Sequence, residues 1–536
     1  MKEPYFSDEL STKIAAIAGE DRIHGIKSKF KTDDERAATF STEIASLYFD
    51  ISKTHISKEL LSCYEQAAEK NNLKSFRLAF LAGEKINSTE QRAVLHTLLR
   101  DSSNQGIAMR DPAVLEQAEH SKAQFETQFN AIDKALSARQ TPVRNIIHVG
   151  IGGSSLGTQL VYEALKALGE KRTIHFIGNI DAHQLVDILD VCDPKSTIVV
   201  GVSKTFTTAE TLQNLSSIAA WFREQGVEKP LKDFYGVTAN PSAAYDYGLD
   251  EANVVTFPEW VGGRYSVWSS VSLSAAIVLG KEKFQEFLDG AAIVDKHFYA
   301  TDFADNVCFQ AAVLDHYYAN FMGVSSKAIF AYDYRFRSLV DYLQQLETES
   351  NGKDRHRDGR AVNGKTSMVV WGGVGTDVQH SVFQMLHQGT AMIPSEFILV
   401  KKPDHAHAQH HNELLANGIA QTAALLEGQS LETVQEIHRD DGLGKLTEQS
   451  KIFSGDRPSM TILLDQLTPK ALGSLLAFYE HRVFLGGALA DINSFDQMGV
   501  ELGKRLAKQV RPFIDDQVAS DTGFDSSTER LLSKLF

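Results

Sequence analysis

The sequence predicts an α/β protein with two αβα sandwich units on mainly parallel sheets, an N-terminal helical region and a C-terminal arm. Short runs rich in isoleucine and valine alternate with helical patterns, which is typical of a parallel sheet covered by helices on both faces. These runs fall in two blocks along the chain, so we expect two such units. A chain of 536 residues is also too long for one ordinary core, which favours at least two large domains.

The first elements lie in an N-terminal region, up to about residue 110, whose patterns are mostly helical. Within it, STEQRAVLHTLLR (88–100) predicts a helix that starts with capping residues. The apolar face of this helix would carry Val94, Leu95, Leu98 and Leu99. The next block predicts a helix at 207–222 and a first sheet. Its strands are expected at 144–150, 173–178, 196–202, 233–239 and 253–257.

The later strand-like runs predict a second sheet, with long helical patterns between its strands. These strands are expected at 327–332, 366–372, 396–402 and 459–465. A polar stretch and one short amphipathic helix end the chain, either as an arm that packs on a neighbour or as a frayed tail. The domain boundaries are expected at 1–110, 111–280, 281–510 and 511–536.

Composition excludes several classes of partner. The net charge of −15 leaves no basic excess for a nucleic acid, although a small anionic substrate needs only a local positive site. Three scattered cysteines, Cys63, Cys192 and Cys308, give no disulfide framework and no metal spacing. No signal peptide and no membrane span are expected, so we expect a cytoplasmic protein. The stretch DHAHAQHH (404–411) lacks an E-x-x-H or C-x-x-C partner, and we expect no metal there.

The stretch HVGIGGSSLG (148–157) follows a strand and precedes a helix, which is a good place for an anion. A P-loop is excluded because no lysine follows Gly157. A dinucleotide fingerprint is excluded because its third glycine would fall at Ser155. A phosphosugar loop and a tight turn without a ligand both remain open.

The stretch GVSKTFTTAET (201–211) also joins a buried strand to a helix. Hydroxyl and amine groups crowd there, on Ser203, Lys204, Thr205, Thr207 and Thr208. Hydroxyls and free N–H groups at a helix start suit a phosphate monoester. Capping of the helix would explain one hydroxyl but not four beside a lysine, so phosphate binding is favoured.

Four further stretches carry candidate catalytic groups. Arg264 in GGRYSVWSS suits a fixed cation beside an oxyanion or is a surface arginine. Glu347 and Glu349 end a helical stretch, where one carboxylate is either a general base in a cleft or solvated. Two pairs are each seven residues apart and are expected to share a helix face: His380 with His387, and Gln497 with Lys504. One histidine of the first pair is expected to be structural.

Six motifs together resemble the glucose-6-phosphate isomerase family, and GEKINSTEQRAVLHTLLR (83–100) resembles its N-terminal signature. They occur in the family's order over about residues 80 to 510, and six ordered motifs are far more specific than one. The motifs are VGIGGSSLG, SKTFTTAET, GGRYSVWSS, ESNGK, QHSVFQMLHQGT and SFDQMGVELGK.

The resemblance implies a fold, an activity and a set of residues. It implies two sugar-isomerase domains, the second larger than the first, a homodimer, no cofactor, and reversible conversion of glucose 6-phosphate to fructose 6-phosphate in glycolysis and gluconeogenesis. The base would be Glu349, the cation beside the enediolate Arg264, and the ring-opening pair His380 and Lys504, with the histidine supplied by the other subunit. The implied substrate-binding residues are Gly153, Ser154, Ser203, Lys204, Thr205, Thr208, Gln345 and Gln497.

The chain departs from the family pattern at four places. Ser155 stands where the family has aspartate, Thr158 where it has proline, and Ser272 where it has glycine. TDVQH (376–380) replaces T-N-G-Q-H, and its Val378 cannot easily take the positive φ open to glycine. Activity on mannose 6-phosphate and a phosphosugar sensor or extracellular signalling protein on the same fold are the alternatives.

Overall fold

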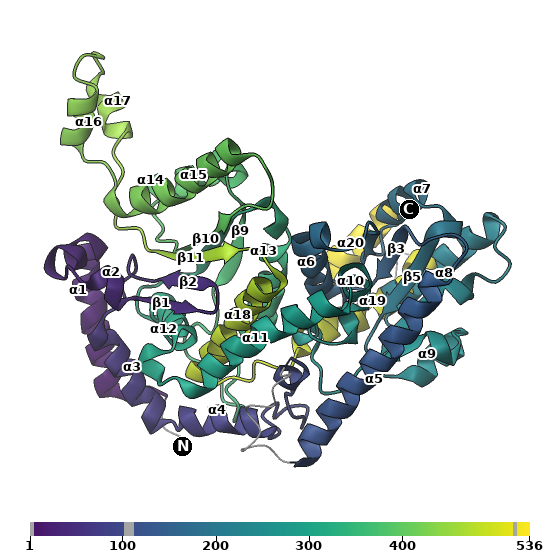
Figure 1. The fold of residues 1–536 in the computed structure, drawn as a ribbon. Coiled ribbons are helices and arrows are strands. Elements are labelled where there is room, and N and C mark those ends of the chain that lie inside the picture. Colours follow the sequence, from purple (N-terminus) through teal and green to yellow (C-terminus); the bar gives the residue numbers. More distant parts are fainter. Residues whose placement is uncertain (1–4, 101–111, 518–522) are drawn as a thin grey trace. The chain divides into compact units, whose positions relative to one another are not determined.

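The computed structural model describes residues 5–100, 112–517 and 523–536 (Figure 1). The chain forms two compact units, residues 1–494 and residues 495–536. Two β-sheets organise the described part of the first unit. The strands of both sheets are mainly parallel, which confirms the predicted α/β class.

The first sheet has five parallel strands in the order β4–β3–β5–β6–β7. They are β3 (Asn145–Val149), β4 (Thr173–Ile177), β5 (Thr197–Val202), β6 (Phe234–Thr238) and β7 (Val254–Thr256). The helices of this region are α5 (Pro112–Ser137), α6 (Leu156–Leu165), α7 (Ala182–Val191), α8 (Ala209–Glu224), α9 (Pro241–Tyr247) and α10 (Leu273–Leu279). The chain leaves β3 for β4 on one side and returns to β5 on the other. In such open sheets, ligands bind where the order reverses.

The second sheet has six strands in the order β1–β2–β11–β10–β8–β9. Four of them run parallel: β8 (Ser326–Tyr332), β9 (Val369–Val374), β10 (Ser395–Lys402) and β11 (Ser459–Gln466). The helices that follow the first sheet are α11 (Lys281–Ala300), α12 (Val307–Asn320), α13 (Leu339–Gln344), α14 (Phe383–Gln388), α15 (Ala408–Glu427), α16 (Leu431–Ile437), α17 (Lys445–Ser450) and α18 (Pro469–Leu489). Nearly every side chain of α18 is buried, and it packs on α11 and α12.

A β-hairpin near the N-terminus corrects the mostly helical prediction for that region. Helices α1 (Asp8–Thr32), α2 (Arg36–Thr39), α3 (Lys58–Lys70) and α4 (Leu73–Ala82) are present. Between α2 and α3, β1 (Ser41–Ile44) and β2 (Leu47–Asp50) pair antiparallel, and β2 adds to β11. Ala45 in the turn has φ 56°, a conformation for which β-hairpin turns usually have Asn or Gly. The sequence therefore contains no indication of the hairpin.

The helix predicted at 88–100 is wrong. Only a 3₁₀ turn forms, His96–Leu99, although Val94, Leu95, Leu98 and Leu99 are all buried as expected. The local helical pattern is overridden because buried polar groups draw this segment into the core. Arg100 pairs with Asp295 at 2.6 Å and with Glu480.

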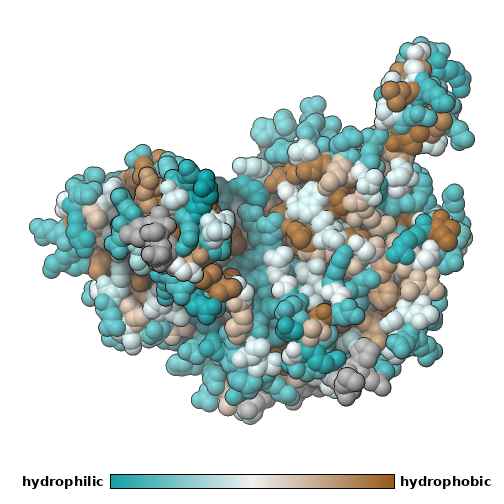
Figure 2. All heavy atoms as spheres, turned by 180° about the vertical axis from the view of Figure 1, so that it is seen from behind, coloured by the Kyte–Doolittle hydropathy of each residue, from teal (hydrophilic) through white to brown (hydrophobic). Residues whose placement is uncertain are grey.

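Helices α16 and α17 project from the second-sheet region (Figure 1). They contact each other, and the chain enters and leaves through a bridge between Gln429 and Phe453. Figure 2 shows apolar side chains on this projection. On α16 and α17, Ile437 is 62% exposed and Leu446 is 80% exposed. Exposed large apolar groups of this kind are typical of a surface that meets another protein.

The second unit contains a 3₁₀ turn, Met498–Val500, and two helices, α19 (Glu501–Asp515) and α20 (Ser526–Leu535). Helix α20 begins at an aspartate cap: the Asp525 carboxylate accepts hydrogen bonds from the backbone N–H groups of Ser527 and Thr528. It confirms the short helix predicted at the end of the chain.

Candidate active site

The two glycine- and hydroxyl-rich loops follow neighbouring strands of the first sheet. β3 and β5 pair in parallel, with Val149 opposite Gly201. Their carboxyl ends therefore lie side by side, and the loops 150–155 and 203–208 begin there. This is also where the strand order reverses, so the sequence and the topology select the same place.

The first loop packs against the turn that carries Arg264. Gly152 has φ +58°, and a Cβ added at Gly153 would overlap the backbone of Gly263. The Ser266 hydroxyl donates to the Gly153 carbonyl at 2.9 Å. The loop and the arginine turn are thus held together backbone to backbone, which only glycine permits at this position.

Hydroxyl groups and a lysine converge in the second loop. Ser203 Oγ lies 2.9 Å from Thr208 Oγ1, and Thr205 Oγ1 lies 2.7 Å from Thr207 Oγ1. Lys204 Nζ donates to the carbonyls of Glu259 and Val261, and burial lowers its pKa. Thr208 is the N-cap residue of α8, but its side chain makes no cap hydrogen bond. Helix capping therefore does not account for this group of hydroxyls.

Arg264 and Glu349 form an ion pair, with Nη1 3.3 Å from Oε1. Arg264 is buried, which excludes the surface interpretation. Its Nε donates to Ser350 Oγ and its Nη2 to the Ser494 carbonyl, both at 2.6 Å. Gln345 Nε2 donates to the other oxygen of Glu349 at 2.7 Å. The guanidinium is held rigidly, and the Glu349 side chain is still 22% exposed.

The choice between the two candidate glutamates is set by a π-helical turn. Helix α13 continues as a π-helix over Gln345–Glu349. Glu347 is buried and its Oε2 lies 2.6 Å from Lys327 Nζ; burial raises the pKa of Glu347. Lys353 Nζ donates to the Glu349 carbonyl at 2.7 Å, which closes the end of the turn. Such π-helical turns are frequent at functional sites. In this one the Glu347 carboxylate is buried, whereas the Glu349 carboxylate remains accessible.

The two pairs expected to share a helix face do not. His380 ends a 3₁₀ turn, Asp377–His380, whereas His387 lies on α14, and the helix is broken between them. His387 Nε2 lies 3.0 Å from Gln421 Oε1 and is a structural histidine, as expected for one of the two. In the second unit, Gln497 precedes the 3₁₀ turn, whereas Lys504 lies on α19 and pairs with Glu501 at 3.3 Å.

His380 is exposed at the end of its turn, on the loop after β9. The hydrogen bonds and ion pair given above for Arg264 and Glu349 do not involve it. These contacts within a single copy of the chain therefore join Glu349 and Arg264, but not this histidine.

The departures from the family pattern fit their surroundings. Thr158 Oγ1 lies 3.4 Å from Ser272 Oγ, so two of the departures contact each other. Ser155 is buried at the start of α6. Val378 is not among the residues with positive φ, and its side chain packs against the core beside the second sheet.

Sequence reasoning missed two residues of this site. His148 lies beneath the first loop, and Ser350 holds Arg264. Both stand inside stretches that the sequence had singled out, HVGIGGSSLG and ESNGK. In the sequence, His148 and Ser350 are marked only as polar residues next to a candidate group. Polar residues in such positions are too common for this to have selected these two.

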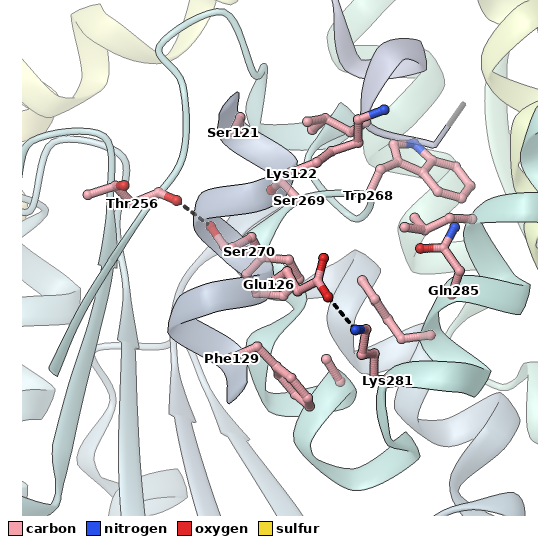
Figure 3. A pocket seen from close by; sticks show the side chains of 15 residues that line it. Ser121, Lys122, Glu126, Phe129, Thr256, Trp268, Ser269, Ser270, Lys281 and Gln285 are labelled. Atoms are coloured by element: carbon pink, nitrogen blue, oxygen red, sulfur yellow. Dashed lines mark hydrogen bonds and ion pairs between the residues drawn. The ribbon is translucent and has the colours of Figure 1, made fainter. Parts of the chain in front are cut away.

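A cavity of about 130 Å³ lies elsewhere in the first unit, between α5 and α11 (Figure 3). Its lining includes Phe129, Trp268 and Phe284, and an ion pair joins Glu126 to Lys281 at its side. Its lining contains none of the sequence-predicted site residues. The candidate site is therefore identified by the chemistry of its side chains and not by the volume of a cavity.

Over the described residues, no three His, Cys, Asp or Glu side chains gather to hold a metal ion. No helix in those same residues has the length and apolarity needed to cross a membrane.

Comparisons with known proteins agree with this geometry. The phosphoglucose isomerase family model matches residues 50–532. A glucose-6-phosphate isomerase from Novosphingobium aromaticivorans is 44% identical over 98% of each chain, and one from Zymomonas mobilis is 41% identical over 95% of this chain and 94% of that one. The crystal structure of a glucose-6-phosphate isomerase from Chlamydia trachomatis superposes with a TM-score of 0.84, at 28% identity and full coverage of both chains. The chain belongs to the phosphoglucose isomerase family.

Proposed function

We propose that the protein interconverts glucose 6-phosphate and fructose 6-phosphate in glycolysis and gluconeogenesis. The observation that carries this proposal is the Arg264–Glu349 pair, placed beside two loops suited to a phosphosugar. Isomerisation moves a proton between carbons 1 and 2 through an enediolate, so it needs a base and a cation. The pair supplies both, and no cofactor is needed.

Each residue has a proposed role. The phosphate is bound by Ser203, Lys204, Thr205 and Thr208, with Gly153 and Ser154 contributing from the first loop. Glu349 takes the proton from carbon 2 of the open aldose and returns it to carbon 1. Arg264 stabilises the negative oxygen of the enediolate. His380 and Lys504 move the protons that open the sugar ring, and Gln345 and Gln497 contact the substrate.

We also propose the four-part division at 1–110, 111–280, 281–510 and 511–536. The five-stranded sheet lies within the second part, and β8 to β11 lie within the third. Strands β1 and β2 belong to the first part but extend the second sheet, which supports packing of that part on the larger domain. All three cysteines are free, and we place the protein in the cytoplasm.

We infer a homodimer in which His380 serves the partner's site. The exposure of His380 and the apolar side chains of α16 and α17 support this arrangement. Mixed dimers of Glu349→Gln and His380→Asn chains test it. If the site is shared, each mixed dimer contains one intact site, because both defects fall in the other.

Half of the dimers in a refolded equal mixture are mixed, and each has one of two sites intact. The mixture should therefore recover about a quarter of wild-type activity, although either parent alone is inactive. Activity is measured before and after mixing and refolding. No recovery, with dimers present by light scattering, would place both residues in the same chain's site.

Replacing Arg264 with alanine should lower kcat by about 100-fold or more and change KM little, because the enediolate exists only on the reaction path. Steady-state kinetics at saturating fructose 6-phosphate measure this. Arg335→Ala is a matched control, since this arginine pairs with Asp333 and Asp404 away from the site. A rise in KM alone would make Arg264 a phosphate clamp.

A coupled assay tests the activity itself. The purified chain is mixed with fructose 6-phosphate, glucose-6-phosphate dehydrogenase and NADP, and steady NADPH formation is expected. If calorimetry shows that fructose 6-phosphate binds but the assay shows no turnover, the alternative of a phosphosugar sensor on the same fold would be favoured. Formation of mannose 6-phosphate in place of glucose 6-phosphate would assign the other epimer.

A further inference from the structure

We propose that His148 is a positioning residue for the phosphosugar: its imidazole holds the first loop in the shape in which Gly153 and Ser154 meet the substrate. This inference rests on the proposed function of that loop. His148 contacts no substrate in this role and acts through the backbone of Ser154.

Two hydrogen bonds fix the imidazole. His148 lies in β3 and is fully buried. Its Nε2 lies 2.7 Å from the Ser154 carbonyl oxygen, and its Nδ1 lies 2.9 Å from Ser274 Oγ. A carbonyl can only accept, so Nε2 carries the hydrogen. Nδ1 then accepts from the Ser274 hydroxyl, and a single tautomer satisfies both partners.

The imidazole joins three parts of the fold. β3 supplies the histidine, the first loop supplies the Ser154 carbonyl, and α10 supplies Ser274 near its start. Burial lowers the pKa of His148 to about 4, so the ring is uncharged at neutral pH. An uncharged ring keeps the Nδ1 lone pair that Ser274 needs.

The loop needs this support because it folds back on itself. Gly150 lacks a side chain where the Ser154 carbonyl comes close: a Cβ there would lie 2.6 Å from that oxygen. The carbonyl therefore points toward His148 in β3. Holding it there fixes the backbone of Ser154, and with it the position from which Gly153 and Ser154 would meet the substrate.

The proposal predicts a particular kinetic change. Gly153 and Ser154 would hold the substrate equally in the ground state and in the transition state. Loss of such uniform binding raises KM and leaves kcat unchanged. A purely structural histidine would instead reduce the amount of folded enzyme, which lowers the apparent kcat at constant KM.

The experiment compares three variants in the full-length protein. His148→Leu removes both hydrogen bonds, and His148→Gln keeps an amide that can donate to the Ser154 carbonyl. Ser274→Ala removes only the donor to Nδ1. A matched control is His175→Gln, on the neighbouring strand β4, where Nε2 bonds to Asn145 Oδ1 at 3.0 Å.

For His148→Leu, KM for fructose 6-phosphate should rise about tenfold, the effect of one lost hydrogen bond, with kcat within about twofold of wild type. His148→Gln should recover most of that loss, Ser274→Ala should lie between them, and the control should match wild type. Unchanged KM in folded His148→Leu, or a fall in kcat at constant KM, would overturn the proposal. If His148→Leu does not fold, unchanged KM in Ser274→Ala overturns it.

A binding measurement separates this inference from the proposed function. Glucitol 6-phosphate lacks the carbonyl, so it can bind but cannot isomerise. Its dissociation constant, by calorimetry, should rise in the same order as KM. Wild-type protein that binds it but turns over no fructose 6-phosphate refutes the isomerase and leaves this test intact. Equal affinity in wild type and His148→Leu refutes the positioning role alone.

Discussion

Replacing Glu349 with glutamine should lower kcat by at least about 100-fold, because general base catalysis typically contributes about 10²–10⁴-fold. Glutamine keeps the shape of the side chain but cannot accept the proton from carbon 2. The free energy of unfolding should change little. The Glu349 side chain is partly exposed, and Arg264 keeps its bonds to Ser350 and Ser494. The coupled assay and urea unfolding measure the two quantities.

Glu347→Gln is the matched control, and it should behave in the opposite way. Its carboxylate is the buried partner of Lys327, at 2.6 Å. Lys327 keeps its pair with Asp315 at 3.0 Å, so the loss of this charge-assisted contact should lower the free energy of unfolding by about 1–3 kcal/mol. The folded fraction should retain its turnover per active site. A Glu349→Gln enzyme with a tenth of wild-type kcat would remove Glu349 from the role of base.

Acidification from pH 6.5 toward pH 4 should destabilise the protein strongly. Burial lowers the pKa of four histidines from 6.5 to about 4: His55, His148, His297 and His316. In this pH range the unfolded chain binds protons that the folded chain cannot, so stability falls as the pH falls. His55 and His148 are fully buried, and each should lower the free energy of unfolding by about 3 kcal/mol at pH 4. This is a large share of a typical free energy of unfolding of about 5–15 kcal/mol.

Burial raises the pKa of four carboxyl groups, Glu65, Asp341, Glu347 and Glu480, and these act in the opposite direction. Burial raises the pKa of Glu480 from 4.5 to about 7, so the folded state binds its proton first, which adds stability as pH falls from 7 to 4.5. Burial also lowers the pKa of His96, His175 and His481, so seven histidines oppose these four carboxyl groups. The net change on acidification is therefore destabilising.

Thermal unfolding at pH 7, 6, 5 and 4.5 measures this dependence. The unfolding midpoint should fall throughout, and His55→Gln should show a shallower fall than wild type, because one proton-binding difference is removed. His183→Gln is the control, since the His183 side chain is 96% exposed. A constant midpoint between pH 7 and pH 5 would contradict the prediction.

The fold could be predicted well where burial dictates composition. Every predicted strand exists, because strands covered on both faces need continuous runs of isoleucine and valine. The β1–β2 hairpin was missed because Ala45 takes a positive φ that its sequence does not signal. The helix predicted at 88–100 was wrong because a helical spacing of apolar residues indicates which residues are buried and not which backbone conformation they adopt. Here Arg100 and its buried partners decide the backbone.

The candidate site was predictable as a set of residue types but not as a geometry. Arg264 and Glu349 are adjacent as the motifs imply. The choice between Glu347 and Glu349 depends on a π-turn, and the residues themselves carry no signature of it. The helix break between His380 and His387 could not be predicted from the sequence either, because no glycine or proline lies between them.

The backbone contact between Gly153 and Gly263 limits how this enzyme can be redesigned. Any side chain at Gly153 would overlap the other loop, so the two loops can neither separate nor slide without losing their packing. Longer or bulkier loop sequences would therefore disturb the proposed phosphate site and the position of Arg264 together. Libraries meant to change which sugar is accepted should keep Gly153 fixed, since a Cβ at Gly263 would make only an ordinary contact with Gly153 Cα at 3.8 Å. Variation belongs instead at side chains proposed to contact the sugar, such as Gln345.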